Sequence, residues 1–306
     1  MEVGFHLPSA QPAADADGIL GVAKTVERLG FDSVWMFDHL FTPTGLESQY
    51  PYSRDGSYPM SPDDPFFDPL ALFGVLAGAT TKIKIGSVVM IAAYRHPLVL
   101  GKAIASIERF APGRLVLGLG AGWMREEFDA LEVPFERRGA RFTEYLQALR
   151  TVWSGDPAGF DGEFYSWPEA GFLPAPTAPV PLIVGGHTDA ALRRAVRHAD
   201  GWAIAFRKED GRGLAALEKR LSDLDRILEE EGRTREDFQL VYQDALWFSD
   251  HVKESLPLTG PADAIASSMA RLKELGVTMV DLLVIGPASL ISENAERFAE
   301  EVRAGL

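Results

Sequence analysis

The chain has 306 residues, 46% of them hydrophobic, so it can bury a large core as one large domain or two ordinary ones. Its formal net charge of −14 argues against a nucleic acid or an anionic membrane as partner, because both need basic surface. The absence of cysteine excludes disulfides, thiolate metal sites and cysteine nucleophiles. A small anionic ligand remains possible if the fold supplies a local positive pocket.

The N-terminal segment has neither a basic start nor an apolar stretch, so we predict no signal peptide. No apolar run approaches the ~18 residues that a membrane span needs. These features predict a cytoplasmic protein that acts on a small molecule.

Short apolar segments alternate with amphipathic segments along the whole chain. Expected strands cover 3–7, 33–37, 83–91, 115–119, 181–184, 202–206, 239–248 and 279–285. Expected helices cover 15–29, 97–110, 136–153, 189–198, 214–230, 262–275 and 289–302. This alternation predicts a (β/α)8 barrel, and a doubly wound parallel sheet is the alternative. No linker or break in composition divides the chain, so we expect one domain over residues 1–306.

Two segments exceed what a bare barrel needs. Residues 40–69, after the second strand, hold six prolines and three tyrosines, which favours a lid or pocket wall over a disordered loop. Residues 156–181, between the fourth and fifth strands, are rich in glycine, proline and aromatic residues and predict an inserted hairpin. We expect both insertions on the barrel face where active sites form.

The stretch 113–141 contains three alternating glycines, Gly118, Gly120 and Gly122, followed by Trp123. Such glycines let a planar or anionic group approach the end of a strand, because no Cβ is in the way. A dinucleotide fingerprint needs a glycine at the position of Trp123 and an acidic residue about 20 positions further on, where this chain has arginines. A Rossmann-type nucleotide site is therefore excluded.

Two polar motifs follow expected strands. Asp38 and His39 end the second strand, where an acid and an imidazole can point into a barrel pocket; a turn-capping role is the alternative. The run 185–188, Gly-Gly-His-Thr, opens a helix, and its backbone amides could bind an anion, with a stabilisation of under ~2 kcal/mol per charge. The alternative is a plain turn between strand and helix.

Other candidates are less specific. Arg207 and Lys208 follow the sixth strand, where they could meet a phosphate or carboxylate or lie on the surface. Val88 and Val89 could present an apolar bulge to a flat ring. The chain has no nucleophile elbow, Walker loop or HExxH motif, and its six histidines are too scattered to predict a metal site. A bound organic cofactor is then the expected source of reactivity.

Taken together, five motifs resemble the bacterial luciferase-like oxidoreductases, in the right order from residue 3 to about residue 202. They are GFDSVWMFDH, IKIGSVVM, GRLVLGLGAGWMREEF, PFERRGARFTEYL and IVGGHTDAALRRAVRHADGW. The pair Asp38-His39 is similar to the branch that uses coenzyme F420, a deazaflavin, because members that use flavin mononucleotide (FMN) more often carry Glu-His-His there.

The resemblance implies specific roles around a deazaflavin ring. Asp38 would hydrogen-bond the head of the cofactor, and His39 would lie near its reactive carbon. Val88–Val89 would form the strand bulge behind the ring, often a non-prolyl cis peptide. The cofactor's phosphate would be bound by Gly185, Gly186 and the amides of His187 and Thr188. The ring and the substrate pocket would be flanked by Gly122 and Trp123.

The chain departs from the sugar-phosphate dehydrogenases of this family. They carry a glutamate at the position of Trp123 and a tryptophan after the Asp-His pair, where this chain has Phe41 or Thr42. Their proton-transfer scheme and substrate therefore do not carry over, and an uncharged, fairly hydrophobic substrate is expected. We place His6, Phe41 and Arg207 on the substrate side.

Three functions follow from this resemblance. The first is hydride transfer between F420 and a small organic substrate, with His39 as the polar catalytic group. The second is an FMN-dependent monooxygenase that uses reduced flavin and oxygen. The third is a protein that binds a flavin or deazaflavin without turnover. Family members are commonly dimers, so we expect a homodimer.

Overall fold

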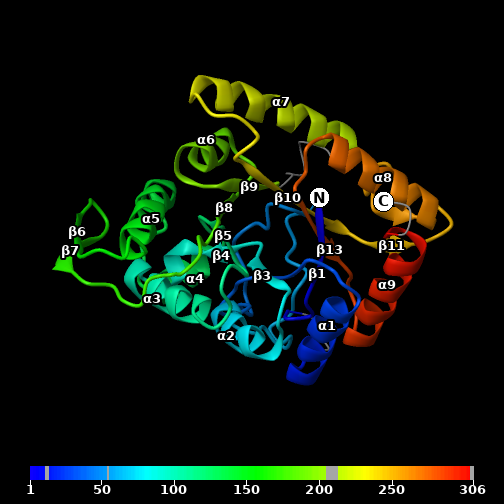
Figure 1. Ribbon diagram of the computed structural model, residues 1–306, viewed down its shortest axis with the longest axis horizontal. Helices are drawn as coiled ribbons and strands as arrows, with labels where there is room; N and C mark the ends of the chain where they lie inside the picture. Colours follow the sequence, from blue (N-terminus) through cyan, green and yellow to red (C-terminus); the bar gives the residue numbers. More distant parts are fainter. Residues whose placement is uncertain (11–13, 54, 205–212, 304–306) are drawn as a thin grey trace.

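The computed structural model describes residues 1–10, 14–53, 55–204 and 213–303. Among them, eight parallel strands form a closed barrel that helices surround (Figure 1). In barrel order the strands are β1 (Glu2–His6), β2 (Ser33–Met36), β3 (Lys84–Ser87), β5 (Leu115–Gly120), β8 (Leu182–Gly185), β9 (Gly201–Ile204), β10 (Gln239–Ala245) and β13 (Met279–Leu283). Pairing of β3 with β5 and of β13 with β1 closes the sheet. The predicted (β/α)8 barrel is confirmed, and the doubly wound alternative is wrong.

The helices coincide closely with the amphipathic segments. They are α1 (Ala16–Arg28), α2 (Pro69–Ala79), α3 (Pro97–Glu108), α4 (Arg125–Ala130), α5 (Arg138–Val152), α6 (Asp189–His198), α7 (Leu214–Glu230), α8 (Ala262–Glu274) and α9 (Ala288–Glu301), with a short 3₁₀ turn at Ala92–Tyr94. In the described part of the chain, no helix is long and apolar enough to cross a membrane.

The helix α2 is the one long helix that the sequence periodicity did not predict. Asp68 caps it by accepting a 2.9 Å hydrogen bond from Ala71 N, and Pro69 occupies its first turn. Its sequence, PLALFGVLAGA, is apolar on every side, so it carries no 3.6-residue alternation. The cap and the proline were therefore the only local signals of this helix.

The expected strand 83–91 is interrupted at Val88 and Val89. It divides into β3 and the short strand β4 (Met90–Ile91), and the Val88–Val89 peptide bond is cis. Both β3 and β4 pair with β5, so the two valines form a bulge in the barrel wall. The cis peptide implied by the family resemblance is thus present in this chain.

The glycines of β5 make room for that bulge. A Cβ on Gly118 would lie 2.0 Å from the Ser87 carbonyl oxygen, and one on Gly120 would lie 2.7 Å from Val89 Cγ2. We expected these glycines to clear space for a ring. The structure shows that the neighbouring strand occupies the space above Gly118, and that Gly120 and Gly122 also line the pocket described below.

The two insertions differ in their position. Residues of the first insertion, within 40–53 and 55–68, line the pocket at the carboxyl ends of the strands, as expected of a pocket wall. The second insertion contains the predicted hairpin, formed by the antiparallel strands β6 (Ala158–Asp161) and β7 (Ser166–Ala170). It follows α5, so it belongs to a helix-to-strand connection, and none of its residues lines the pocket. The expectation that it arises on the active-site face is therefore wrong, although Glu163 at the tip of the hairpin pairs with Arg137, which lines the pocket. A last strand pair, β11 (Trp247–Phe248) with β12 (Thr259–Gly260), follows β10.

Candidate active site

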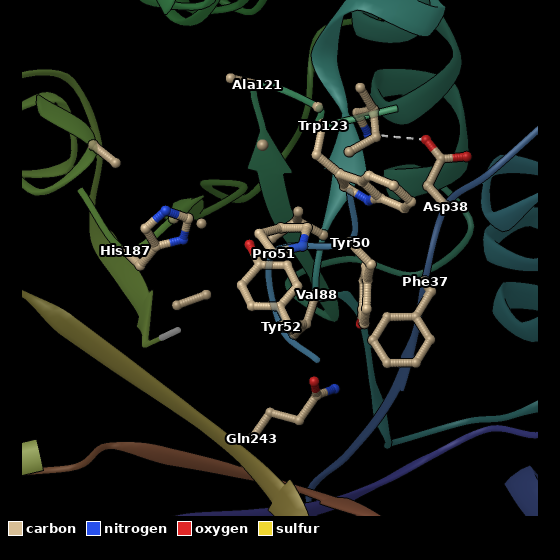
Figure 2. A pocket seen from close by; sticks show the side chains of 18 of the residues that line it. Phe37, Asp38, Tyr50, Pro51, Tyr52, Val88, Ala121, Trp123, His187 and Gln243 are labelled. Carbon is tan, nitrogen blue, oxygen red and sulfur yellow. Dashed lines mark hydrogen bonds between the residues drawn. The ribbon is translucent and has the colours of Figure 1, made fainter. Parts of the chain in front are cut away.

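One large cavity, of about 1140 Å³, opens at the carboxyl ends of the barrel strands (Figure 2). Its walls include the residues that end or directly follow β2, β5, β8, β9, β10 and β13. The loop 40–68 supplies an aromatic wall that includes Tyr50, Tyr52 and Tyr58. This is the position where barrel enzymes build their active sites.

His39 lies in this cavity and is held by a buried carboxylate. Its Nδ1 is 2.8 Å from Oε2 of Glu127, which is fully buried in α4. The hydroxyl of Tyr94 donates to the same oxygen, and the Leu40 N–H donates to Oε1 over 2.5 Å. A carboxylate only accepts hydrogen bonds, so the contact assigns the proton to Nδ1 of His39 and turns Nε2 away from Glu127.

The Tyr94 hydroxyl stays a donor over the whole physiological range. Burial, followed by the charge of Glu127, raises the pKa of Tyr94 far above its usual value. Glu127 therefore orients His39, as the aspartate of a catalytic triad orients its histidine, and the neutral phenol of Tyr94 supports Glu127. His39 and Glu127 are 88 positions apart in the sequence, and they meet because β2 and β5, which precede them, lie on either side of β3 in the barrel.

Asp38 lies beside His39 but faces the barrel wall. Its residue exposure is 2%, and its carboxylate accepts a hydrogen bond from Ile91 N at 2.9 Å (Figure 2). It accepts another from Arg95 Nη1 at 2.7 Å. Arg95 also bridges to Asp68, the cap of α2. Burial alone would lower the pKa of Arg95, but the hydrogen bond and charge of Asp38 outweigh it and raise that pKa. The described contacts of Asp38 thus hold β4 next to the bulge, and its expected bond to a cofactor stays a prediction.

The apolar bulge and an aromatic cluster both line the cavity. Val88 and Val89 line it and are only partly buried, so their side chains remain available to a ligand. Trp123 packs its ring 5.6 Å from that of His39, 5.2 Å from that of Tyr50 and 5.3 Å from that of Tyr58. Figure 2 shows Trp123, Tyr50 and Tyr52 around the same open space as Val88.

The predicted anion cradle also belongs to this cavity. Gly185, Gly186, His187 and Thr188 all line it, and Gly186 has φ of 131°, which a side chain would rarely adopt. Thr188 caps α6 through a 3.1 Å hydrogen bond from Ala191 N. The positive end of the α6 dipole therefore faces the pocket.

Two arginines strengthen the positive character of this end. Arg138, at the start of α5, and Arg194, in α6, both line the pocket. Arg138 Nε donates to the Gly122 carbonyl at 3.0 Å, and Arg194 Nε donates to Thr143 Oγ1 at 2.9 Å. In the described ranges, neither has a carboxylate within ion-pair distance, and burial lowers the pKa of both. Two half-buried guanidinium groups that form no ion pair make this end of the pocket suitable for an anion, although the chain as a whole has a net charge of −14.

The three residues expected on the substrate side have different positions. His6 is 1% exposed and lies one layer below the pocket, with its ring 3.9 Å from that of Phe37, which lines it. Phe41 is 37% exposed and is not among the lining residues. Arg207, like Lys208, lies outside the described residues.

Sequence reasoning missed several residues of the site. Glu127 stood out only as part of an acidic helix start, although a second carboxylate after the glycine-rich strand was a usable signal. Arg95 and Tyr94 gave no pattern at all. Gln243, which lines the pocket from β10, was also not singled out.

Comparisons with known proteins agree with this geometry. Residues 1–254 match the family model described as luciferase-like monooxygenase. An uncharacterized protein of Mycobacterium tuberculosis is 34% identical over 225 residues, which cover 74% of this chain and 76% of the relative. An F420-dependent glucose-6-phosphate dehydrogenase of Nakamurella multipartita is 28% identical over 302 residues, 93% of this chain and 82% of that enzyme.

The fold is also found among solved structures. An F420-dependent secondary alcohol dehydrogenase, solved with an F420-acetone adduct, superimposes with a TM-score of 0.77 at 18% identity. The match covers 100% of this chain and 99% of the other. At that identity, the likeness concerns the barrel and its connections.

Proposed function

Since this chain belongs to the luciferase-like monooxygenase family, we propose that it is an oxidoreductase that transfers a hydride between coenzyme F420 and a small, uncharged organic substrate. The F420-dependent relative that matches nearly the whole chain supports this choice of cofactor. The lining of the chain's own pocket supports the proposal as well.

The observation that carries the proposal is the division of one cavity into a positively charged, anion-binding end and an apolar, aromatic end. The cradle at 185–188, with Arg138 and Arg194, suits a phosphate and further carboxylates. The bulge at Val88–Val89 suits the face of a flat ring. F420 combines a flat deazaflavin with a phosphodiester and a tail of carboxylates, whereas FMN carries one phosphate. Two arginines without acid partners fit the more highly charged cofactor.

The residues of the site divide the work of such a reaction. When bound, F420 would supply or accept the hydride at a ring carbon. His39, fixed through Nδ1 by Glu127, offers Nε2 to give a proton to the substrate oxygen or to take one from it. The aromatic wall of Tyr50, Tyr52 and Trp123 keeps bulk water from this position.

The test is to measure dissociation constants of the purified protein for F420 and FMN, and then turnover with carbonyl and enone acceptors. We expect F420 to bind more tightly than FMN. His39→Ala should leave the F420 affinity within about threefold and lower turnover by about 10²–10⁴-fold. The exposed His251→Ala serves as a matched control.

Two results would overturn the proposal. Tight FMN binding without F420 affinity would favour the monooxygenase. F420 binding without turnover of any acceptor would favour a protein that only binds the cofactor.

A further inference from the structure

A buried polar cluster lies at the floor of the cavity and has no part in the chemistry described above. It consists of His6 on β1, Gln243 on β10 and Asp281 on β13, three neighbouring strands of the barrel. Gln243 and Asp281 are paired directly in the β10–β13 register. His6 is 1% exposed and Asp281 is fully buried, whereas Gln243 reaches the pocket. Buried polar groups of this kind are costly unless they have a role.

The hydrogen bonds of the cluster fix the orientation of the Gln243 amide. Asp281 Oδ2 lies 2.9 Å from His6 Nδ1 and 2.6 Å from Gln243 Nε2. A carboxylate only accepts, so both nitrogens donate to the same oxygen. The amide nitrogen of Gln243 is thereby directed to Asp281, and its carbonyl oxygen is left for the cavity.

Aromatic rings lie near the part of the amide that faces the cavity. Figure 2 shows the Gln243 side chain extending from β10 into the space below Tyr52 and beside Phe37. The ring of Phe37 is packed on His6, so the cluster supports the aromatic wall as well as the amide. A ligand at this point meets apolar ring faces and the oriented amide oxygen of Gln243, which accepts hydrogen bonds.

We propose that Gln243 is a specificity-determining residue that selects neutral aromatic substrates bearing a hydroxyl or N–H donor. The amide oxygen accepts the hydrogen bond, and the aromatic wall packs on the ring of the substrate. Asp281 and His6 are positioning residues, because they act only by holding the amide. That this selection serves hydride transfer rests on the proposed function, but the hydrogen bond itself does not.

The test uses two probes of the same shape, 2-naphthol and 2-methoxynaphthalene, and measures their binding to the cofactor-free protein by equilibrium dialysis. Only 2-naphthol can donate. We expect about tenfold tighter binding of 2-naphthol, which is ~1.4 kcal/mol and the upper end of the range for one uncharged hydrogen bond. In Gln243→Met, which keeps the volume and removes the amide oxygen, we expect the two probes to bind equally.

Further variants separate selection from folding. Gln147→Leu, exposed on α5, is the matched control and should keep the tenfold preference. Asp281→Asn lets the amide of Gln243 turn over, so the preference should fall to about threefold. Thermal denaturation shows which variants are folded. If Gln243→Met does not fold, Gln243→Leu replaces it, because it also lacks the amide oxygen, and the two probes should again bind equally.

Three outcomes would overturn the inference. They are equal binding of both probes to the wild-type protein, binding of neither, and a preference that survives in Gln243→Met. The F420 affinity is measured in parallel on each variant. If F420 does not bind but the naphthol preference behaves as expected, the proposed function fails while the role of Gln243 stands.

Discussion

The bulge at Val88–Val89 depends on the absence of side chains in β5, and alanine substitutions can measure that dependence. A Cβ on Gly118 would lie 2.0 Å from the carbonyl oxygen of Ser87, which belongs to the backbone of a barrel strand and cannot rotate away. We therefore expect Gly118→Ala to cost about 3 kcal/mol of unfolding free energy or more. At Gly120 the obstacle is Val89 Cγ2 at 2.7 Å, a side chain that can turn, so Gly120→Ala should cost about 1–2 kcal/mol.

Urea denaturation gives these free energies directly. Gly74→Ala in α2 is the control, because no atom lies within 4 Å of its Cβ position and the helix interior favours alanine by about 1 kcal/mol. Combining Gly120→Ala with Val89→Ala should recover about 1 kcal/mol relative to the sum of the single variants. A cost below about 1 kcal/mol for Gly118→Ala, or no coupling between Gly120 and Val89, would refute the argument.

Three further predictions concern single charged groups. In Glu127→Gln an amide donor faces the donors of His39 and Tyr94, so turnover should fall about 10²–10³-fold at unchanged F420 affinity. The control Asp129→Asn, on the same helix, should change neither turnover nor affinity. Wild-type turnover in Glu127→Gln would contradict the role of Glu127. Arg194→Ala should weaken F420 binding about tenfold at low salt and less at high salt. Arg226→Ala, on the exposed face of α7, should not weaken it. A loss of affinity that is independent of salt would count against an electrostatic contact. Burial would raise the pKa of Glu108, but hydrogen bonds from the N–H groups of Thr177, Gly113 and Ala178 outweigh burial and lower that pKa. The ionised Glu108 therefore stabilises the fold above its ordinary pKa of 4.5, and this stabilisation is lost as the pH falls through the lowered pKa. Glu108→Gln should therefore cost about 2 kcal/mol at pH 7 and much less near pH 3 in denaturant titrations, and a cost that does not change with pH would exclude this explanation.

The barrel could be predicted because each of its layers leaves a local pattern in the sequence. The segments 189–198 and 214–230 alternate with the period of a surface helix, and the structure gives α6 and α7 the same bounds. The helix α2 has no polar face, so periodicity could not reveal it. Periodicity therefore predicts the elements that face water and fails for those that do not.

The site was predicted only in part, for a different reason. His39 and the cradle at 185–188 follow strands directly, and a position at a strand end can be inferred from the sequence. The partners of such residues come from other units of the barrel: Glu127, which holds His39, from the helix after β5, and Asp281, which holds Gln243, from β13. Such pairs depend on the barrel register, which local patterns do not encode. The cis peptide at Val88–Val89 came from the family resemblance and from no property of the valines.

The loop 40–68 is fastened to the barrel at two adjacent carboxylates. Glu126 accepts hydrogen bonds from the N–H groups of Glu47 and Ser48, at 2.8 and 2.9 Å, and Glu127 accepts one from Leu40. All three are backbone contacts, so they do not depend on which side chains the loop carries. The pocket wall can thus acquire new aromatic residues while the attachment stays the same. Substitutions between residues 49 and 60 can therefore change the lining of the pocket, and with it the substrate, as long as Glu126 and Glu127 keep the loop attached.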